Sequence, residues 1–394
     1  MGKNLVFCAD GTWNGPGEPE WGGRAGETTN VFKLFDALEG RDTPGTLRFA
    51  DEQERVAGDA SGQAVQVAKY LHGVGDSENP LVKFLGGAFG AGLIARVVRG
   101  YTFLSRSYVP GDAIFIVGFS RGAYTARALA GMIVAQGLLD ASKLDLTQKE
   151  AAYRWGAAVW YRHQRSLRAS WLADLESFVA DLPGFFSVPP PPGTLVSAPL
   201  RALGVWDTVG ALGIPAFAAD HERLDLFRFA DTRLSPAVAR AFHAVSVDEA
   251  RQDFDPTLWD PDPRVVQALF PGAHADVGGG YPEGAESGLS DGALRWMAER
   301  LAGEGLRLAA SPASLGAPSP KGTAHRPWTH FPWTHLPTGS RTFPEGLRLH
   351  PSVLDRLAAG PVVPDPGQSA EPYRPANLQA YLEGTGAKPG VLMG

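Results

Sequence analysis

The 394-residue chain has little cysteine, no long uninterrupted hydrophobic run and no excess of positive charge. Its one cysteine, Cys8, excludes an intrachain disulfide framework and a cysteine-rich zinc site. The most apolar uncharged stretches, 84–95 and 128–139, are too short to cross a bilayer as helices. The formal net charge of −6 leaves no broad basic face for a phosphate backbone, so we expect no nucleic-acid partner.

The start of the chain also lacks a targeting signal. No basic segment followed by an apolar one precedes the first predicted strand, so no signal peptide is predicted. Together with the absence of a predicted transmembrane segment, this favours a protein that is cytoplasmic as synthesised. The 48 glycines and 32 prolines, about a fifth of all residues, predict many turns and exclude a helical bundle.

Apolar runs of strand length alternate with helical patterns along the chain. The predicted strands lie at 4–9, 64–71, 113–117, 200–206, 239–247 and 265–270. The main predicted helices lie at 31–38, after an N-cap at Thr29-Asn30, at 80–106, at 123–139, and at 289–301 with Ser290 as N-cap. This alternation predicts one α/β domain over 1–394, with a mainly parallel central sheet flanked by helices.

Two segments stand apart from this alternation. Residues 141–199 are rich in aromatics and are predicted to form a helical insertion, a candidate lid whose Trp155 and Trp160 would line a substrate pocket. The alternative is that these aromatics pack a helical layer onto the sheet. Residues 303–394 form a Pro/Gly-rich C-terminal extension, of which 303–345 are predicted to pack irregularly on the surface. If 141–199 is only packing, the extension's Trp328, Phe331 and Trp333 become the pocket candidates.

The strongest chemical motif follows the most apolar strand. Gly118-Phe119-Ser120-Arg121-Gly122 matches the Gly-x-Ser-x-Gly nucleophile elbow, in which glycines make room for a serine on a strained strand-to-helix turn. Ser120 is the predicted nucleophile. The backbone N–H of Arg121, at the start of the following helix, is a predicted oxyanion donor. The alternative is a glycine-rich turn with a surface serine.

A serine nucleophile needs a base and a carboxylate that orients the base. Asp207 follows a predicted strand and is the candidate acid; the alternative is a turn cap. His274 follows another predicted strand and precedes three glycines, so it is the candidate base; the alternative is a structural histidine. His350 is the rival base, whereas His243 lies within an apolar run and is predicted to be a core residue.

Further polar residues follow predicted strands. The backbone N–H groups of Gly11 and Thr12 are candidates for the second oxyanion donor, because the turn after an early strand supplies it in hydrolases. The carboxylates of Asp10 and Asp276 could help organise the site, bind a divalent cation, or cap turns. No other cofactor is expected.

Taken together, these motifs resemble the DUF2235 family, which includes phospholipase effectors of type VI secretion systems. The motifs that carry the resemblance are Asp10-Gly11-Thr12-Trp13-Asn14, Gly118-Phe119-Ser120-Arg121-Gly122-Ala123, Trp206-Asp207-Thr208-Val209-Gly210 and the run from Pro271 through His274 and Asp276 to Tyr281. The resemblance implies an α/β-hydrolase-like fold with Ser120, Asp207 and His274 as catalytic triad. It also implies a secretion-system or immunity partner, peripheral membrane contact and delivery to another cell.

The predicted function is therefore that of a serine hydrolase. It would cleave carboxylic esters, in particular lipid or phospholipid acyl esters, through the triad and an acyl-enzyme. Two alternatives remain open: a non-catalytic binding or scaffold domain of the same fold, and a metal-assisted hydrolase that uses Asp10 and Asp276.

Overall fold

The structure is a computed structural model of the whole chain. It describes residues 2–11, 28–44, 52–72, 88–167, 188–209, 232–331, 333–335 and 337–385.

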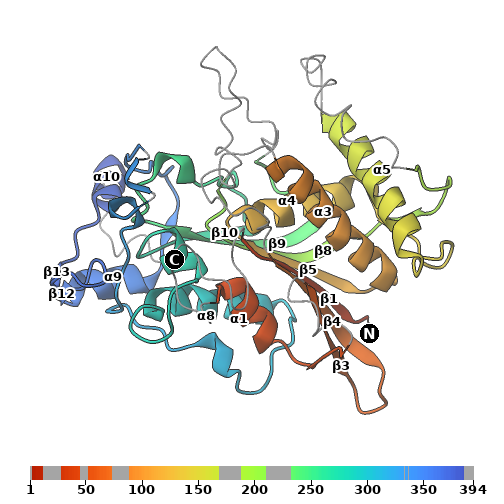
Figure 1. Cartoon of the computed structure of the whole chain (residues 1–394), viewed down its shortest axis with the longest axis horizontal. Coiled ribbons are helices and arrows are strands. Elements are labelled where there is room, and N and C mark those ends of the chain that lie inside the picture. The colour runs from red at the N-terminus through yellow and green to blue at the C-terminus, as the bar shows by residue number, and fades with distance from the viewer. Residues whose placement is uncertain are drawn as a thin grey trace.

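A nine-stranded sheet runs through the molecule in the order β11-β10-β9-β8-β5-β1-β4-β3-β2 (Figure 1). Its strands are β1 (Asn4–Ala9), β2 (Arg41–Asp42), β3 (Glu52–Gly58), β4 (Ala64–Leu71), β5 (Ala113–Phe119), β8 (Leu200–Trp206), β9 (Val238–Ser246), β10 (Val265–Phe270) and β11 (Arg348–Leu349). All neighbours from β4 to β11 pair in parallel. The predicted fold class, α/β with a mainly parallel sheet, is confirmed.

The edge of the sheet differs from the prediction. β3 pairs antiparallel with β4, and β2 pairs antiparallel with β3. Neither strand was predicted, because β3 reads Glu-Gln-Glu-Arg-Val-Ala-Gly and carries a mostly polar sequence. β3 therefore lacks the apolar run that identifies the central strands.

Helices cover both faces of the sheet (Figure 1). On one face lie α3 (Ala88–Ser107), α4 (Arg121–Gln136) and α5 (Lys149–Leu167), and on the other lie α1 (Asn30–Ala37) and α8 (Gly288–Gly303). Thr29 is the N-cap of α1, as predicted. Ser290 is not the N-cap of α8: the helix begins earlier, with Ser287 in the cap position. Each face has its own buried apolar cluster.

The described part of the 141–199 insertion is well packed. The short strands β6 (Leu138–Leu139) and β7 (Leu195–Val196) pair antiparallel at its base. Between them α5 packs on α3 and α4. Trp160 is only 2% exposed and belongs to the buried cluster on that face, and Trp155 packs against the same cluster. For α5, these contacts favour the alternative of a helical layer packed on the sheet; residues 168–187 lie outside the described residues.

The C-terminal extension packs against the sheet. Its elements are η4 (Ala313–Leu315), η5 (Pro327–Thr329), η6 (Trp333–His335), β11, α9 (Pro351–Ala358), β12 (Pro361–Val362), β13 (Glu371–Pro372) and α10 (Ala376–Thr385). η4 packs on α1 and α8, whereas β11, α9, β12, β13 and α10 gather at the β10–β11 end of the sheet (Figure 1). There Leu349, Val353 and Leu378 form a third apolar cluster with residues of β9 and β10. The extension therefore contributes a strand and a core of its own.

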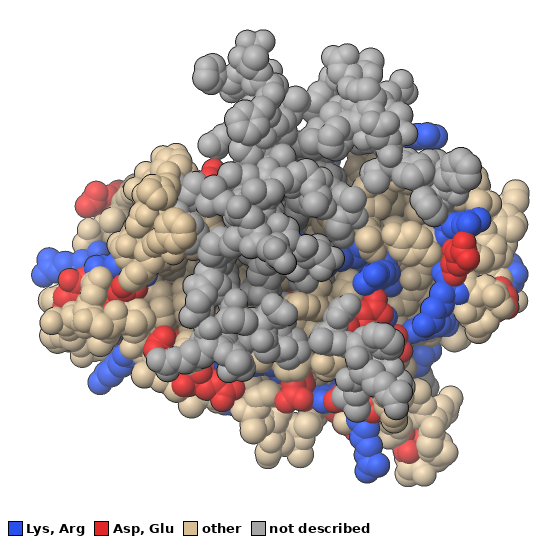
Figure 2. Space-filling model, in the orientation of Figure 1, with Lys and Arg blue, Asp and Glu red and all other residues tan. Residues whose placement is uncertain are grey.

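Charges of both signs are interspersed over the face seen in Figure 2. Beside β3, for example, Lys69 pairs with Glu52 and Glu54, and Arg106 pairs with Glu54. Among the described residues no helix is both long enough and apolar enough to span a membrane.

Candidate active site

Ser120 lies between β5 and α4 in a strained backbone conformation. Its φ of 56° and ψ of −123° lie in a region that L-residues rarely adopt. The Ser120 N–H donates to the Trp206 carbonyl at 3.1 Å, which ties the turn to the neighbouring strand β8. This conformation is that of a nucleophile elbow, which presents the serine side chain above the end of the sheet.

The two glycines of the motif are needed where they stand. A Cβ on Gly118 would collide with the backbone of Gly122, and a Cβ on Gly122 would collide with the carbonyl oxygens of Ala9 and Asp10. The elbow is therefore packed directly against the end of β1. Backbone at this distance leaves no room for any side chain.

Asp207 follows β8 immediately and is fully buried. It is the second non-glycine residue of the described chain with a positive φ, at 35°. Its Oδ1 accepts the Ser246 N–H at 2.9 Å. Its Oδ2 lies 2.6 Å from Nδ1 of His274, so the structure brings the predicted acid and base together.

His274 is the first residue of α7 (His274–Gly278), after β10. Its ring lies 4.6 Å from the ring of Phe119 and 5.0 Å from that of Phe254, measured between centroids. Because Phe119 precedes Ser120, the first contact places the imidazole beside the elbow. The Nδ1–H group donates a hydrogen bond to Asp207, so the lone pair of the neutral ring is on Nε2. Nε2 is buried and has no hydrogen-bond partner among the described residues.

The surroundings set the charge of each group. Burial lowers the pKa of His274, and Asp207 offsets this only in part. Burial alone would raise the pKa of Asp207, but Arg341 and His274 hold it well below its usual range. At neutral pH the pair is therefore a carboxylate and a neutral imidazole, which can accept a proton on Nε2.

His243 and His350, the two further histidines considered in the sequence, have local structural roles. His243 is fully buried in β9; its Nε2 accepts the Thr208 N–H at 3.1 Å, and burial together with Arg127 lowers its pKa to about 3. The rival base His350 is the N-cap of α9 and stacks on Phe270 at 4.3 Å. Burial lowers its pKa to about 4.

The predicted oxyanion donors are the backbone N–H groups of Arg121, Gly11 and Thr12. Arg121 is the first residue of α4, directly after the elbow serine. The Gly11 N–H donates to Oδ1 of Asp10 at 2.7 Å. Thr12 lies outside the described residues. The oxyanion donors therefore stay a prediction.

Asp10 and Asp276 are held by separate sets of protein donors. Asp10 accepts from Thr29 Oγ1 at 2.7 Å and Tyr70 OH at 2.6 Å, and burial raises its pKa to about 6. Asp276 accepts the Ala273 N–H at 2.8 Å, and its Oδ1 lies 2.7 Å from Nδ1 of His325. Among the described residues no group of three or more His, Cys, Asp or Glu could hold a metal ion. These contacts fit two carboxylates that organise the turns after β1 and β10.

Arg341 is a site residue that the sequence does not reveal. It lies in the C-terminal extension, is buried, and binds both oxygens of Asp207 at 2.8 and 2.9 Å. It belongs to no motif and follows Asp207 by 134 residues within a segment rich in proline and glycine. Only the fold places it there.

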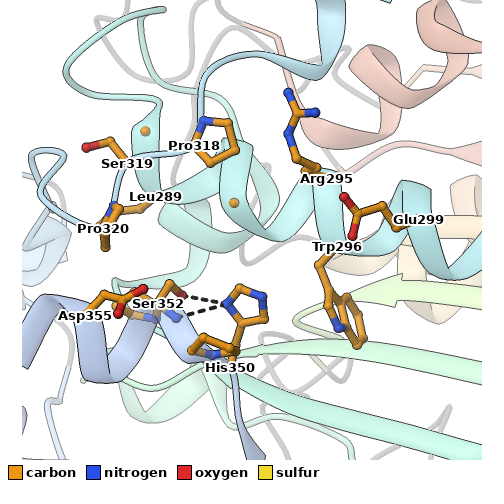
Figure 3. A pocket seen from close by; sticks show the side chains of 14 residues that line it. Leu289, Arg295, Trp296, Glu299, Pro318, Ser319, Pro320, His350, Ser352 and Asp355 are labelled. Carbon is orange, nitrogen blue, oxygen red and sulfur yellow. Dashed lines mark hydrogen bonds between the residues drawn. The ribbon is translucent and has the colours of Figure 1, made fainter. Parts of the chain in front are cut away.

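A separate pocket of about 280 Å³ lies between α8, α9 and residues 318–320 (Figure 3). His350 and Trp296 line it, and dashed lines in Figure 3 show Ser352 hydrogen-bonded to His350. None of Ser120, Asp207 and His274 belongs to its lining.

Comparison with known proteins gives one family match and several distant relatives. A family model described as the catalytic domain of Tle1-like phospholipase effectors of the type VI secretion system matches residues 3–300. An uncharacterized protein of Saccharomyces cerevisiae is 26% identical over 264 residues, which are 67% of this chain and 34% of that protein.

The similar solved structures are more distant. An uncharacterized protein from Pseudomonas aeruginosa has a TM-score of 0.45 at 19% identity, covering 81% of this chain and 49% of that one. The Tle1 effector bound to the VgrG spike of the type 6 secretion system has a TM-score of 0.37 at 17% identity, covering 72% of this chain and 52% of that one. The chain thus spans about a third of the yeast protein and about half of each of the other two.

Proposed function

The chain belongs to the family of Tle1-like phospholipase effector catalytic domains, and from this premise we propose that it is a serine hydrolase that cleaves lipid acyl esters. The observation that carries the proposal is the arrangement around His274. Its Nδ1 is bound to Asp207, its Nε2 is unpartnered among the described residues, and its ring lies beside the strained Ser120 elbow.

The proposed reaction follows from these positions. His274 Nε2 takes the proton of Ser120 Oγ as this oxygen attacks the ester carbonyl, and Asp207 stabilises the imidazolium that forms. The Arg121 N–H at the start of α4 donates to the oxyanion of the tetrahedral intermediate. The imidazolium then protonates the departing alcohol, and an acyl-Ser120 ester remains. A water molecule, deprotonated by His274, hydrolyses that ester and restores the enzyme.

An aromatic wall beside the base supports an apolar substrate. The ring of Phe254 packs edge-on against His274 and against Trp333, with 5.5 Å between the centroids of Phe254 and Trp333. Trp333, rather than the buried Trp160, is the better-placed of the predicted pocket residues. An acyl chain needs apolar surface close to the nucleophile, and on the rings of Phe254 and Trp333 that surface is shared with the guanidinium of Arg251, which stacks on both.

The family also motivates a biological setting. We propose that the protein works on lipid surfaces in peripheral contact with a membrane, with a type VI secretion apparatus as its partner and another cell as its destination.

The non-catalytic alternative has one observation against it. A domain that only binds has no need of a serine held at φ 56°, since such strain persists where surrounding structure supports a function. The metal-assisted alternative would depend on Asp10 and Asp276, which are occupied by other protein groups.

A substrate panel tests the proposal. The native protein and Ser120→Ala are assayed with p-nitrophenyl acyl esters of increasing chain length and with phospholipid vesicles, each with and without a chelator. We expect hydrolysis by the native protein that chelation leaves intact and that Ser120→Ala lowers by several orders of magnitude. Activity that survives Ser120→Ala but not chelation would instead support the metal-assisted hydrolase.

A further inference from the structure

We propose that Arg341, which lies beyond the residues matched by the family model, is a positioning residue of the triad: its guanidinium holds Asp207 ionised and aligned with His274. This inference rests on the proposed roles of Ser120, Asp207 and His274. It makes the C-terminal extension part of the catalytic apparatus.

Arg341 and Asp207 form a bidentate ion pair. Nη1 donates to Oδ1 at 2.8 Å and Nη2 donates to Oδ2 at 2.9 Å. The side chain of Arg341 is 2% exposed and that of Asp207 is 0% exposed, so water does not screen the pair. This geometry suits arginine and no other side chain, because only the guanidinium offers two parallel donors.

The guanidinium completes the hydrogen bonding of Asp207. Oδ1 also accepts the Ser246 N–H, and Oδ2 also receives His274 Nδ1. Among the described residues each oxygen of Asp207 thus has two partners, and one of the two is Arg341. The carboxylate cannot rotate without breaking a charge-assisted bond, so Arg341 fixes the direction in which Asp207 accepts from His274.

Arg341 is itself held in place by backbone. Its guanidinium donates to the carbonyls of Ser246 and Phe254. Its N–H donates to Oδ1 of Asn377 in α10, and Nδ2 of Asn377 donates in turn to the Val247 carbonyl at 2.9 Å. The extension is therefore hydrogen-bonded to the segment after β9 through both Arg341 and Asn377. These bonds fix the position of the guanidinium.

The charge of Arg341 also bears on the base. Among the described residues, the charged groups that act on His274 are Asp207, Arg251 and Glu249, and the last two form a buried ion pair at 2.8 Å. Arg341 contacts Asp207, and the carboxylate of Asp255 interacts with both Arg341 and Asp207. Without the guanidinium, Asp207 would be an uncompensated negative charge beside the imidazole. The protonated form of His274 would then gain stability, and its pKa would rise.

Three variants separate orientation, charge and folding. Arg341→Met removes the positive charge and both guanidinium donors and keeps an unbranched side chain of similar length. Arg341→Lys keeps the positive charge but cannot form the bidentate pair. Arg356→Met is the matched control, because Arg356 is an equally buried arginine of the same extension whose guanidinium donates to the carbonyls of Pro320 and Gly322 and makes no contact with Asp207.

The measurements are kcat/KM against pH with a soluble ester, and thermal unfolding of each variant. For Arg341→Met we expect kcat/KM to fall about 10- to 100-fold and the acid limb of the profile to move to higher pH. Arg341→Lys should keep the native limb with an intermediate kcat/KM. Arg356→Met should lose thermal stability but keep the native kcat/KM and the native limb.

Two results would overturn the proposal. One is an Arg341→Met profile that superposes on that of the native protein. The other is an Arg356→Met variant with the same loss of kcat/KM and the same displaced limb. If Arg341→Met does not fold, Arg341→Lys decides: a folded lysine variant with native kcat/KM contradicts the need for the bidentate pair. Failure of the proposed function is distinct, because it would appear as native hydrolysis that Ser120→Ala leaves unchanged.

Discussion

Backbone strain in the described part of the chain falls on two non-glycine residues, Ser120 and Asp207, with φ of 56° and 35°. Each directly follows a central parallel strand, β5 or β8, and the two strands are neighbours in the sheet. A strained residue persists only where its surroundings over-determine it, and such positions concentrate at functional sites. At the scale of single residues, the strain thus coincides with the proposed nucleophile and acid.

The acid limb of the pH–rate profile should lie below the ordinary histidine pKa of 6.5. His274 must be neutral to accept the Ser120 proton, and burial lowers its pKa in the folded protein. The rate should therefore be retained as pH falls through 6.5 and lost at lower pH, as the imidazole becomes protonated. We expect His274→Ala to abolish turnover, with kcat/KM against pH as the measurement.

His350→Asn is the control for that profile. Asparagine can take over the cap of α9, and it does not titrate, so rate and profile should stay native. A displaced or abolished profile in His350→Asn, together with an active His274→Ala, would make His350 the base.

How far the sequence predicts the site depends on whether a residue follows a recognisable strand. Asp207 and His274 could be predicted, because apolar runs identify β8 and β10 and the strands' carboxyl ends meet at one edge of the sheet. Arg341 could not, because its contact with Asp207 depends on how the extension folds back over 134 positions. The strained φ of Asp207 is likewise invisible in the sequence.

At the scale of elements, the elbow depends on close contact between the start of α4 and the end of β1. Gly122→Ala places a Cβ against the carbonyl oxygens of Ala9 and Asp10, which belong to backbone and cannot yield. We expect the free energy of unfolding to fall by about 1–3 kcal/mol and turnover to fall with it. Urea unfolding and ester hydrolysis measure the two effects.

Gly131→Ala, in the same helix, is the matched control. Its Cβ would meet only Nε2 of His163, at 3.6 Å, an ordinary contact. Alanine should raise the free energy of unfolding by about 0.5–1 kcal/mol and leave turnover native. Equal effects of the two substitutions would show that the close approach at Gly122 does not constrain the elbow.

Elements could be predicted from sequence where apolar residues dominate and were missed where polar residues do. The predicted strand at 64–71 coincides with β4, which is rich in apolar residues and whose last four residues are buried. β3 was not predicted because its sequence is mostly polar. The N-cap of α8 is Ser287, three residues before the predicted Ser290, and it was missed because a glycine rather than an apolar residue follows it. Local sequence patterns do not record the tertiary neighbours that stabilise an element of this kind.

At the scale of the whole molecule, three apolar clusters support the sheet, and α5 belongs to the one formed with α3 and α4. Trp160→Ala should therefore lower the free energy of unfolding by about 3–5 kcal/mol and leave acyl-chain preference unchanged. Trp155→Ala, at a partly buried position, should cost less. Urea unfolding beside the ester panel checks both. A stable Trp160→Ala with altered chain preference would instead support the lid.

The most direct test of the account is the covalent labelling of Ser120 by a fluorophosphonate, followed by intact-protein mass spectrometry and peptide mapping. Such a probe reacts with a serine whose hydroxyl is activated by a neighbouring base. The account predicts one adduct per folded native chain, located on Ser120, and its loss in Ser120→Ala and in His274→Ala. A folded native protein that takes up no label, or that is labelled equally after Ser120→Ala, would contradict it.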